Sequence, residues 1–384
     1  MGHWVQIMFW AAAIALFYVY VGYPVLLCLI ASLFRPRKPE PGYTPDISIL
    51  IAACNEEANI RQKLEQTLKL DYPPDKVEVL VLSDGSQDAT DEIVTSFADP
   101  RVRLVRIPER RGKTNAQNEG VKQARGEILV FSDATTIYHS QALKYLAANY
   151  QDPSVGAASG RYQYFDRSEN SPTGLGTIAF WNYENTIKTK QSRISTLTGC
   201  CGCIYSVRKS AYTALAPEVI SDLVQPLRVI QKGYRVVFED RALAYEETTE
   251  STAEEFAMRV RVITRGMRGL LSVPELLKPW KYPWIAFQLF SHKILRWTVP
   301  LLLLLLLAGN LALMSQPYFR ALLVLQFGFY ALALLQGLVP IHRRWKPLGI
   351  PLYFCTLNAA AMLGAIDLLR GKKHVIWQPV RNKG

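Results

Sequence analysis

The chain lacks both glycine-rich motifs by which many nucleotide-dependent enzymes hold phosphate. Neither Gly-x-Gly-x-x-Gly nor Gly-x4-Gly-Lys-Ser/Thr occurs beside its Val/Ile/Leu-rich segments. Kinases, P-loop ATPases and dinucleotide enzymes are therefore disfavoured. The sequence also shows no internal repeat and no low-complexity segment.

Cysteine and histidine are scarce, with 6 and 5 residues respectively. Cys200, Cys201 and Cys203 form a run, but neighbouring thiols do not easily converge on one tetrahedral metal ion, and no histidine is near. We expect these thiols to be small residues in a tight segment, kept reduced in the cytoplasm.

The charge is unbalanced towards basic residues, with 44 Lys and Arg against 32 Asp and Glu, a net charge of +12. Much of the excess lies beside long apolar segments, as is typical of the cytoplasmic flanks of membrane helices. Between about residues 35 and 275 both signs are mixed, so we do not expect a nucleic-acid partner. The basic clusters are Arg35 to Lys38, His292 to Arg296, Arg343 to Lys346 and Arg370 to Lys373.

Four segments have the length and apolarity to span a bilayer. The first lacks a basic start and a small-residue cleavage site, so we interpret it as a retained anchor and not a signal peptide. The segments are approximately Ile7–Phe34, Trp297–Met314, Tyr318–Ile341 and Leu348–Leu369. The predicted layout is an anchor at 1–35, a catalytic domain at 36–250, amphipathic interface helices at 251–296, a membrane bundle at 297–370 and a basic tail at 371–384.

The distribution of charge predicts a multi-pass cell-membrane protein with a cytoplasmic catalytic domain, because basic residues follow the first anchor and almost none precede it. Three further crossings would leave the tail outside, yet the tail is basic, which favours the inside. A re-entrant or interfacial C-terminal segment would reconcile the two indications.

The polar region alternates predicted strands and helices. Apolar strand-length runs occupy 46–53, 77–82, 102–107 and 127–131, and helical segments follow each of them. This order predicts an α/β fold with a parallel sheet covered by helices on both faces. Ligands of such sheets bind at the carboxyl ends of the strands.

Acidic residues follow these runs. Glu56, Asp84 and Asp133 come at or just after three predicted strand ends, and Asp222 follows a further apolar run. Carboxylates gathered at one sheet edge repel one another unless a positive charge lies among them. A divalent cation carrying a phosphorylated substrate supplies that charge, so the pattern indicates an enzyme acting on a nucleotide-linked group.

Six motifs in order resemble those of the inverting family 2 glycosyltransferases with the GT-A, Rossmann-like nucleotide-diphospho-sugar transferase fold, and in particular the membrane-integral branch with the hyaluronan, chitin and cellulose synthases. The resemblance covers about residues 46–297. The motifs are Ala53-Cys54-Asn55-Glu56-Glu57, Ser83-Asp84-Gly85-Ser86-Gln87-Asp88, Gly112-Lys113-Thr114-Asn115, Ser132-Asp133-Ala134, Thr198-Gly199-Cys200-Cys201-Gly202-Cys203 and Ser221-Asp222 with Leu227-Arg228.

The resemblance implies a nucleotide sugar, most simply a UDP-sugar, as donor, and Mg²⁺ or Mn²⁺ bound by Asp133. It implies donor contacts from Ala53, Asn55, Glu56, Asp84, Ser86, Lys113, Ser132 and Asp133. From the basic face of the segment near residue 260 we add Arg265 as a partner of the donor diphosphate. For Asp84 and Lys113, bracing of a turn and a solvated lysine remain the alternatives.

The acceptor side is implied to include Gly199, Cys200, Gly202, Leu227 and Arg228, with Asp222 as the catalytic base. A positioned carboxylate accepts the proton of the attacking hydroxyl, and direct attack inverts the anomeric carbon. The alternative for Asp222 is a residue that only begins a helix.

Two departures from the family pattern bear on the acceptor, which is a growing polysaccharide or a membrane lipid. Thr135 stands where a second metal-binding aspartate is expected, and Met258 and Val262 replace the Gln and Trp of the acceptor motif. Processive polymerisation is therefore less favoured, and transfer of a single sugar to a lipid is the alternative. A non-catalytic regulator that binds nucleotide sugars is the alternative from another class. The same segment alternates apolar and arginine faces, which is typical of a helix in the membrane interface.

Overall fold

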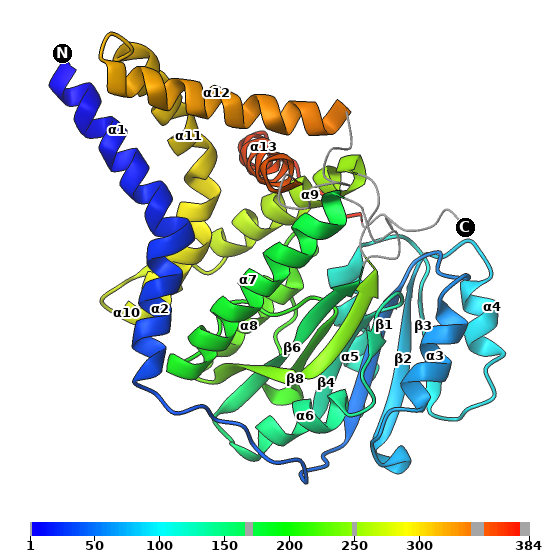
Figure 1. Ribbon diagram of the computed structural model, residues 1–384. Coiled ribbons are helices and arrows are strands. Elements are labelled where there is room, and N and C mark those ends of the chain that lie inside the picture. The colour runs from blue at the N-terminus through cyan, green and yellow to red at the C-terminus, as the bar shows by residue number, and fades with distance from the viewer. Residues whose placement is uncertain (1, 166–171, 248–251, 339–348, 377–384) are drawn as a thin grey trace.

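The computed structural model describes residues 2–165, 172–247, 252–338 and 349–376 (Figure 1). The predicted α/β sheet is present and has eight strands in the order β3-β2-β1-β4-β7-β6-β8-β5. Their bounds are Ile47–Ala53 (β1), Val77–Asp84 (β2), Val102–Ile107 (β3), Ile128–Asp133 (β4), Ile137–Tyr138 (β5), Val155–Phe165 (β6), Ile204–Arg208 (β7) and Arg235–Glu247 (β8).

The first four strands of this order are parallel, as the alternation of strands and helices predicts. The sequence did not predict β7, which pairs antiparallel with both β4 and β6. Because β7 runs opposite to β4, the segment entering β7 lies where β4 ends, and Ser132 pairs with Ile204. This reversal brings residues 199–203 to the edge of the sheet that carries Asp133.

Two buried clusters cover the faces of the sheet. Ile49 and Ile51 pack with Leu64 and Leu146 on one face, while Leu50 and Leu82 pack on the other. The alternation follows from the pleat, which points successive side chains to opposite faces. The helices of the catalytic region are Ile60–Leu68 (α3), Thr90–Thr95 (α4), Lys113–Gln123 (α5), Ala142–Ala148 (α6), Pro172–Ile194 (α7), Ser221–Gln231 (α8) and Thr252–Leu271 (α9).

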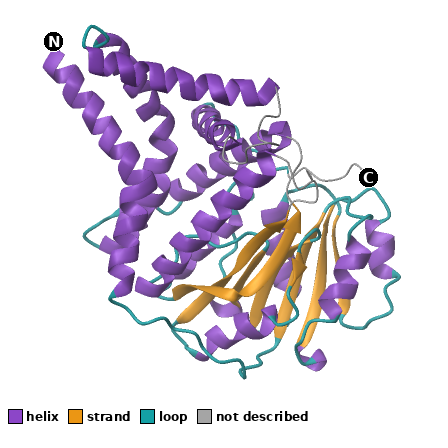
Figure 2. Cartoon of the chain, viewed as in Figure 1, coloured by secondary structure: helices purple, strands orange, loops and turns teal. Residues whose placement is uncertain are grey.

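The apolar helices stand apart from the sheet, as Figures 1 and 2 show. Within the described residues, four helices are long and apolar enough to cross a membrane: His3–Ser32, Pro283–Ala312, Pro317–Gly337 and Gly349–Leu369. They comprise Gly2–Phe17 (α1), Tyr18–Gly22 (η1) and Tyr23–Ser32 (α2); Pro283–Leu289 (α10), Phe290–Ile294 (η6) and Leu295–Ala312 (α11); Pro317–Leu338 (α12); and Gly349–Leu369 (α13). The second apolar helix therefore begins at Pro283, inside the region expected to hold interface helices.

Helix α9 joins the catalytic region to α13. Arg259 Nη2 donates to the Tyr353 hydroxyl at 3.1 Å, and Thr264 Oγ1 donates to the Gly364 carbonyl at 3.2 Å. The expected apolar and arginine faces are thus both covered in part: Val260 and Arg265 are each about 6% exposed.

The segment after α13 returns to the catalytic region. Arg268 Nη2 donates to the Lys372 carbonyl at 3.0 Å, and Lys373 Nζ lies 3.6 Å from Glu218 Oε1. The described part of the tail, residues 371–376, therefore contacts the catalytic domain. The remainder of the predicted tail, residues 377–384, is outside the described residues.

The turn before β4 leaves no room for a side chain at Gly126. A Cβ there would overlap the Ser48 amide nitrogen and lie 2.6 Å from the Ile47 carbonyl carbon, both backbone atoms of β1. We expect Gly126→Ala to destabilise the protein by about 1–3 kcal/mol, because the backbone of a central strand cannot move aside. The measurement is the melting temperature of the full chain in detergent.

Gly42 is the matched control for this substitution, since a Cβ added there would have no atom within 4 Å. We expect Gly42→Ala to leave the melting temperature within the range of an ordinary surface change. Equal melting temperatures for the two variants would contradict the close packing of the turn on β1.

Candidate active site

Three predicted site segments meet at one edge of the sheet. Ala53 pairs with Ser83, and Ala52 pairs with Asp133. Because β1, β2 and β4 are parallel, their carboxyl ends share this edge, where ligands of α/β sheets bind. The expected gathering of Ala53, Asp84 and Asp133 is therefore seen.

The turns after β1 and β2 hold each other through side-chain hydrogen bonds. The Gln87 amide donates to Asn55 Oδ1 at 2.8 Å, and the Asn55 amide donates to Ser86 Oγ at 3.1 Å. The Glu56 amide donates to Thr90 Oγ1 at 2.8 Å. Asn55 has a left-handed backbone with φ of 55°, which asparagine tolerates better than most residues. Asn55, Glu56 and Ser86, which are predicted to contact the nucleotide sugar, therefore belong to two turns that these hydrogen bonds join into one rim.

Asp84 supports the loop that leads to Lys113. Its carboxylate, about 1% exposed, accepts hydrogen bonds from the amides of Arg111 and Gly112, both at 2.8 Å. Gly112 has a φ of 87°, a conformation that glycine adopts without strain. Asp84 thus has the bracing contacts of the alternative interpretation, and its contact with the nucleotide stays a prediction.

Lys113 is the centre of the site. It begins α5, forms an ion pair with Asp133 and donates to the Gly202 carbonyl at 3.3 Å. Burial would lower the pKa of Lys113, but the carboxylates of Asp133 and, to a smaller extent, Asp222 hold that pKa above its ordinary value. The lysine is therefore charged and lies within the field of both acids.

Asp222 lies beside the same group. It is in the first turn of α8, and its carbonyl accepts a hydrogen bond from the Cys200 amide at 2.8 Å. A Cβ on Gly202 would lie 2.6 Å from Asp222 Oδ2, so the glycine backbone faces the carboxylate directly. Burial raises the pKa of Asp222, against the opposing charges of Lys113, Lys188, Lys293 and Arg265. A raised pKa is what a carboxylate acting as a base near neutral pH requires.

A buried lysine that the sequence did not single out stands behind Asp133. Lys63 Nζ donates to Ser132 Oγ at 2.8 Å and to the Thr136 carbonyl at 2.5 Å. Burial lowers the pKa of Lys63 to about 8, although Cys203 and Asp133 act against it. Lys63 therefore fixes the turn that presents Asp133, and Ser132 serves this turn through its hydroxyl. A lysine one turn into a helix that is otherwise amphipathic gives no local signal of this role.

Some of the other residues predicted for the acceptor side lie near Asp222, and the rest lie in or beside the hydrophobic core. A Cβ on Gly199 would lie 3.5 Å from Leu223, at the start of the segment that reaches Asp222. Leu227 is fully buried in a core cluster, and Arg228 Nη2 donates to the Ser272 carbonyl at 3.1 Å. The structure thus brings Gly199, Cys200 and Gly202 to Asp222, whereas Leu227 and Arg228 join α8 to the end of α9.

Arg265 reaches the site indirectly. Its Nη2 donates to Thr114 Oγ1 at 2.9 Å and to the Val219 carbonyl at 2.6 Å. Burial lowers the pKa of Arg265 to about 10. These contacts tie α9 to the start of α5 and to the loop before α8, and the predicted contact with the donor diphosphate remains untested.

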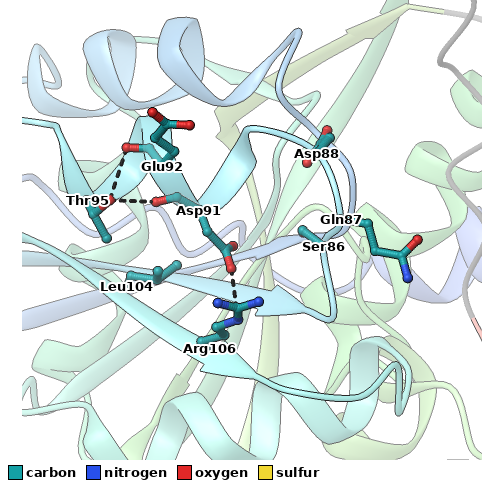
Figure 3. Close-up of a pocket in the computed structure, with 8 residues that line it drawn as sticks. All are labelled: Ser86, Gln87, Asp88, Asp91, Glu92, Thr95, Leu104 and Arg106. Carbon is teal, nitrogen blue, oxygen red and sulfur yellow. Dashed lines mark hydrogen bonds and ion pairs between the residues drawn. The ribbon is translucent and has the colours of Figure 1, made fainter.

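A cavity of about 470 Å³ lies away from this cluster, between α4 and β3 (Figure 3). Asp91 pairs there with Arg106 at 3.2 Å. Asp88, Asp91 and Glu92 give the cavity an acidic lining that repels phosphate. It shares Ser86 with the predicted donor residues but contains none of Lys113, Asp133 and Asp222.

The groups available for a metal ion are few. Thr135, which replaces the second expected aspartate, donates to Glu246 Oε1 at 3.2 Å. Among the described residues, no cluster of three or more His, Cys, Asp or Glu side chains is arranged to hold a metal ion. Asp133 Oδ1 is buried and meets the Lys113 ammonium, without a conventional hydrogen bond.

Comparison with known proteins agrees with this geometry. The family described as Glycosyl transferase family 2 matches residues 48–215. Poly-beta-1,6-N-acetyl-D-glucosamine synthase of Staphylococcus epidermidis is 29% identical over 241 residues, 61% of this chain and 58% of that protein. The protein of the same name from Staphylococcus aureus strain COL is 29% identical over 232 residues, 59% of this chain and 55% of that protein. The chain thus aligns with little more than half the length of these curated relatives.

One solved structure resembles nearly the whole chain. The mannosyltransferase PcManGT from Pyrobaculum calidifontis, in complex with GDP-Man and Mn²⁺, has a TM-score of 0.74 and 25% identity, covering 94% of this chain and 99% of that one.

Fold, site and comparisons together define a sugar-transferring enzyme of the GT-A class. Residues 48–215 match glycosyltransferase family 2, and the chain is similar to poly-beta-1,6-N-acetyl-D-glucosamine synthases and to a solved mannosyltransferase. The predicted family, fold class and enzyme class are confirmed.

Gly202 offers a test of the position of Asp222. We expect Gly202→Ala to lower the rate of sugar transfer about 100-fold, because a shift of a catalytic group by about 1 Å costs that order of rate. The new methyl group would lie 2.6 Å from Asp222 Oδ2 and must displace it. The measurement is the initial rate of sugar transfer by the purified protein. A melting temperature equal to that of the wild type shows that the variant is folded.

Gly199→Ala is the matched control, because its new methyl group meets only Leu223 at 3.5 Å, an ordinary contact. It is expected to keep most of the activity. If both variants transferred sugar at the wild-type rate, the contact between Gly202 and Asp222 would not matter to catalysis.

Proposed function

We propose that the protein is a membrane-bound, inverting glycosyltransferase that moves a sugar from a nucleoside-diphosphate sugar to a polysaccharide or lipid-linked acceptor. One observation carries the proposal: the Lys113 ammonium pairs with Asp133 and donates to the carbonyl of Gly202, whose backbone faces the Asp222 carboxylate. The donor needs an anion site for its diphosphate, and the acceptor needs a base for its hydroxyl. The two must lie close together, and this arrangement supports that.

The donor diphosphate would bind at Lys113 and Asp133. Departure of a nucleoside diphosphate increases negative charge, and a fixed ammonium together with a divalent cation stabilises that charge without reorganisation. Lys113 is held for this task by its place at the start of α5, where the helix dipole also favours anions. A UDP-sugar is our donor, as the sequence motifs imply.

A GDP-sugar is the second candidate donor, because the structurally similar mannosyltransferase is in complex with GDP-Man. Asp84 and the rim formed by Asn55 and Ser86 would face the base in either case. A panel of nucleotide sugars with purified protein distinguishes the two donors.

The residues at Asp133 suit Mg²⁺ or Mn²⁺ that arrives with the diphosphate better than a resident ion. Of the two positions expected to bind the cation, Asp133 alone offers a carboxylate, and Thr135 is engaged by Glu246. Both cations accept phosphate oxygens and water as their remaining ligands. Asp133 would supply the protein ligand, and the cation would neutralise the leaving diphosphate.

Asp222 would accept the proton of the attacking hydroxyl. Its carboxylate is fixed on one side by Gly202 and held near the positive charge of Lys113. Attack from the side of Asp222, opposite to the departing diphosphate, gives inversion at the anomeric carbon. The same geometry argues against a non-catalytic regulator, which has no need for a base.

The catalytic domain is proposed to lie on the cytoplasmic face of the cell membrane, where nucleotide sugars are made. Contacts of Lys372 and Lys373 with Arg268 and Glu218 support a tail on the same side as the domain. An even number of crossings then separates domain and tail. Helix α13, which lies along α9 from Tyr353 to Gly364, is our candidate for the segment that does not cross.

Replacement of Asp222 tests the proposed base. Asp222→Asn should lower kcat about 10²- to 10⁴-fold, the usual contribution of a general base, with little change in donor binding. In the wild type, kcat should fall as the pH drops through the pKa of Asp222, because the protonated acid accepts no proton. Burial raises that pKa, so the fall begins at a higher pH than for an exposed aspartate.

The corresponding control is Asp240→Asn, a surface aspartate paired with Lys38 at 3.2 Å. It should keep the wild-type kcat and the same fall of kcat at low pH. An Asp222→Asn variant that retains the wild-type kcat and pH profile rules out this residue as the base.

Cation binding gives a test that does not depend on turnover. Electron paramagnetic resonance of Mn²⁺ should detect weak binding to the protein alone and at least tenfold tighter binding with UDP or GDP present. Asp133→Asn should remove the nucleotide-dependent part, because it removes the protein ligand. Tight Mn²⁺ binding without nucleotide, unchanged in Asp133→Asn, would exclude the proposed cation site.

A further inference from the structure

A lysine that the chemistry above does not use lies close to Asp222. Lys188 on α7 is only about 5% exposed, and its Nζ donates to Cys201 Sγ at 3.0 Å. Cys201 stands between Cys200, whose amide donates to the Asp222 carbonyl, and Gly202, whose backbone faces the Asp222 carboxylate. This short segment separates the buried ammonium from the proposed base.

A second lysine comes from the first C-terminal membrane helix. Lys293 lies in η6, and the residue before it, His292, approaches α7 at two points: Gln191 Nε2 at 3.3 Å and Glu184 Oε1 at 3.2 Å. Glu184, Lys188 and Gln191 are spaced by four and three residues and share one face of α7. Lys293 follows His292 in η6, and its charge acts on Lys188 and, together with that of Lys188, on Asp222.

The charges of Glu184 and Asp222 act on both lysines, but neither lysine forms an ion pair with a described carboxylate. In the part of the chain that the structure describes, no carboxylate lies within ion-pair distance of Lys188 or Lys293. Glu184, the buried acid on the same face, pairs with Arg296 and His292, which hold the pKa of Glu184 well below its usual range despite burial. Among the described residues, Lys188 has only the Cys201 thiol and the Trp181 ring as direct partners, and Lys293 is partly exposed. A phosphate would add charge-assisted hydrogen bonds that these partners do not supply.

The position of the lysines indicates where such an anion would come from. Helix α7 packs on the first membrane helix: Tyr183 Oη donates to the Tyr20 carbonyl at 3.1 Å, and Gln191 Nε2 donates to Tyr23 Oη at 2.8 Å. Lys293 itself belongs to the candidate span Pro283–Ala312. Both lysines thus lie at the junction of the catalytic domain with membrane helices, the level at which a lipid presents its head group.

We propose that Lys188 and Lys293 bind the phosphate of a lipid-linked acceptor and thereby hold its attacking hydroxyl beside Asp222. The inference rests on the proposed function and specifies its acceptor: a membrane lipid that carries a phosphate between its hydrocarbon chain and the group that is glycosylated. The donor diphosphate occupies Lys113 and Asp133, and the acceptor phosphate occupies the second pair of cations.

Binding of a simple phospholipid analogue tests the proposal without turnover. The full chain in dodecyl maltoside micelles, saturated with Mn²⁺ and UDP to fill the donor site, is titrated with dodecyl phosphate by calorimetry. Dodecanol supplies the same chain without charge, and inorganic phosphate supplies the charge without the chain. We expect dodecyl phosphate to bind at least tenfold more tightly than either, which identifies a lipid phosphate as the ligand.

Substitutions then assign the site. Lys293→Gln should weaken dodecyl phosphate binding about tenfold, because one charge-assisted hydrogen bond is lost, whereas Lys293→Arg should retain most of it. Lys188→Met should have a similar effect when its melting temperature shows a folded protein. Lys190→Gln, on the same helix two residues away and more exposed than Lys188, is the matched control and should bind as the wild type does.

Three results overturn the proposal. The first is equal affinity for dodecyl phosphate and dodecanol, and the second is wild-type affinity in folded Lys293→Gln and Lys188→Met. The third is tighter binding of inorganic phosphate than of dodecyl phosphate, since it assigns the cations to a soluble anion. A transfer assay separates the two levels of inference. Transfer to a lipid-phosphate acceptor with the wild-type KM in Lys293→Gln supports the glycosyltransferase without the phosphate site. Phosphate binding without any sugar transfer supports the phosphate site without the glycosyltransferase.

Discussion

The mutual repulsion of carboxylates at one sheet edge is the constraint around which this protein is built. Asp133 and Asp222 both act on Lys113, and each would raise the cost of ionising the other at low dielectric. Lys113 relieves that repulsion from within the chain. The ammonium is held in place by α5, whose first turn depends on Gly112 and on the Asp84 carboxylate beneath it. The site is therefore assembled before any ligand arrives.

The mixed sheet supplies the second acid. A fully parallel sheet would place the segment before the next strand at the opposite edge. Strand β7 runs antiparallel to β4, so the turn that enters β7 lies beside the end of β4. This turn carries Cys200 and Gly202, which contact the backbone and the carboxylate of Asp222. The closeness of Asp222 requires a glycine at position 202 of this turn.

The membrane helices and the catalytic domain form one continuous structure. Helix α9 is joined to α13 by Arg259 and Thr264, and α7 is joined to the first membrane helix by Tyr183 and Gln191. Both α7 and α9 also reach the surroundings of Asp222. Under the proposed function, an acceptor from the bilayer would meet the proposed base on the side where the apolar helices and the catalytic domain share buried charged groups.

Local features of the sequence were enough to predict the first four strands, the family motifs and the four apolar helices. Their boundaries moved by a few residues: Asp84 and Asp133 end β2 and β4, where the sequence had placed them in the turns that follow. Asn55 has a left-handed backbone and accepts a hydrogen bond from the turn after β2, while α3 does not begin until Ile60. The local sequence does not indicate this hydrogen bond, because its donor is 32 residues away.

The sequence by itself determined which chemical groups the protein has and which segments are apolar, since periodicity and turn chemistry act over a few residues. Only the tertiary structure decided which charges meet. Lys113 donates a hydrogen bond to Gly202, 89 positions later in the chain, and Lys63 donates one to Ser132, 69 positions later. Such pairs depend on strand order, on the reversal at β7 and on the packing of α7 against membrane helices. None of these leaves a signature in the residues on either side of a lysine, because an ion pair depends on distance in space and not along the chain.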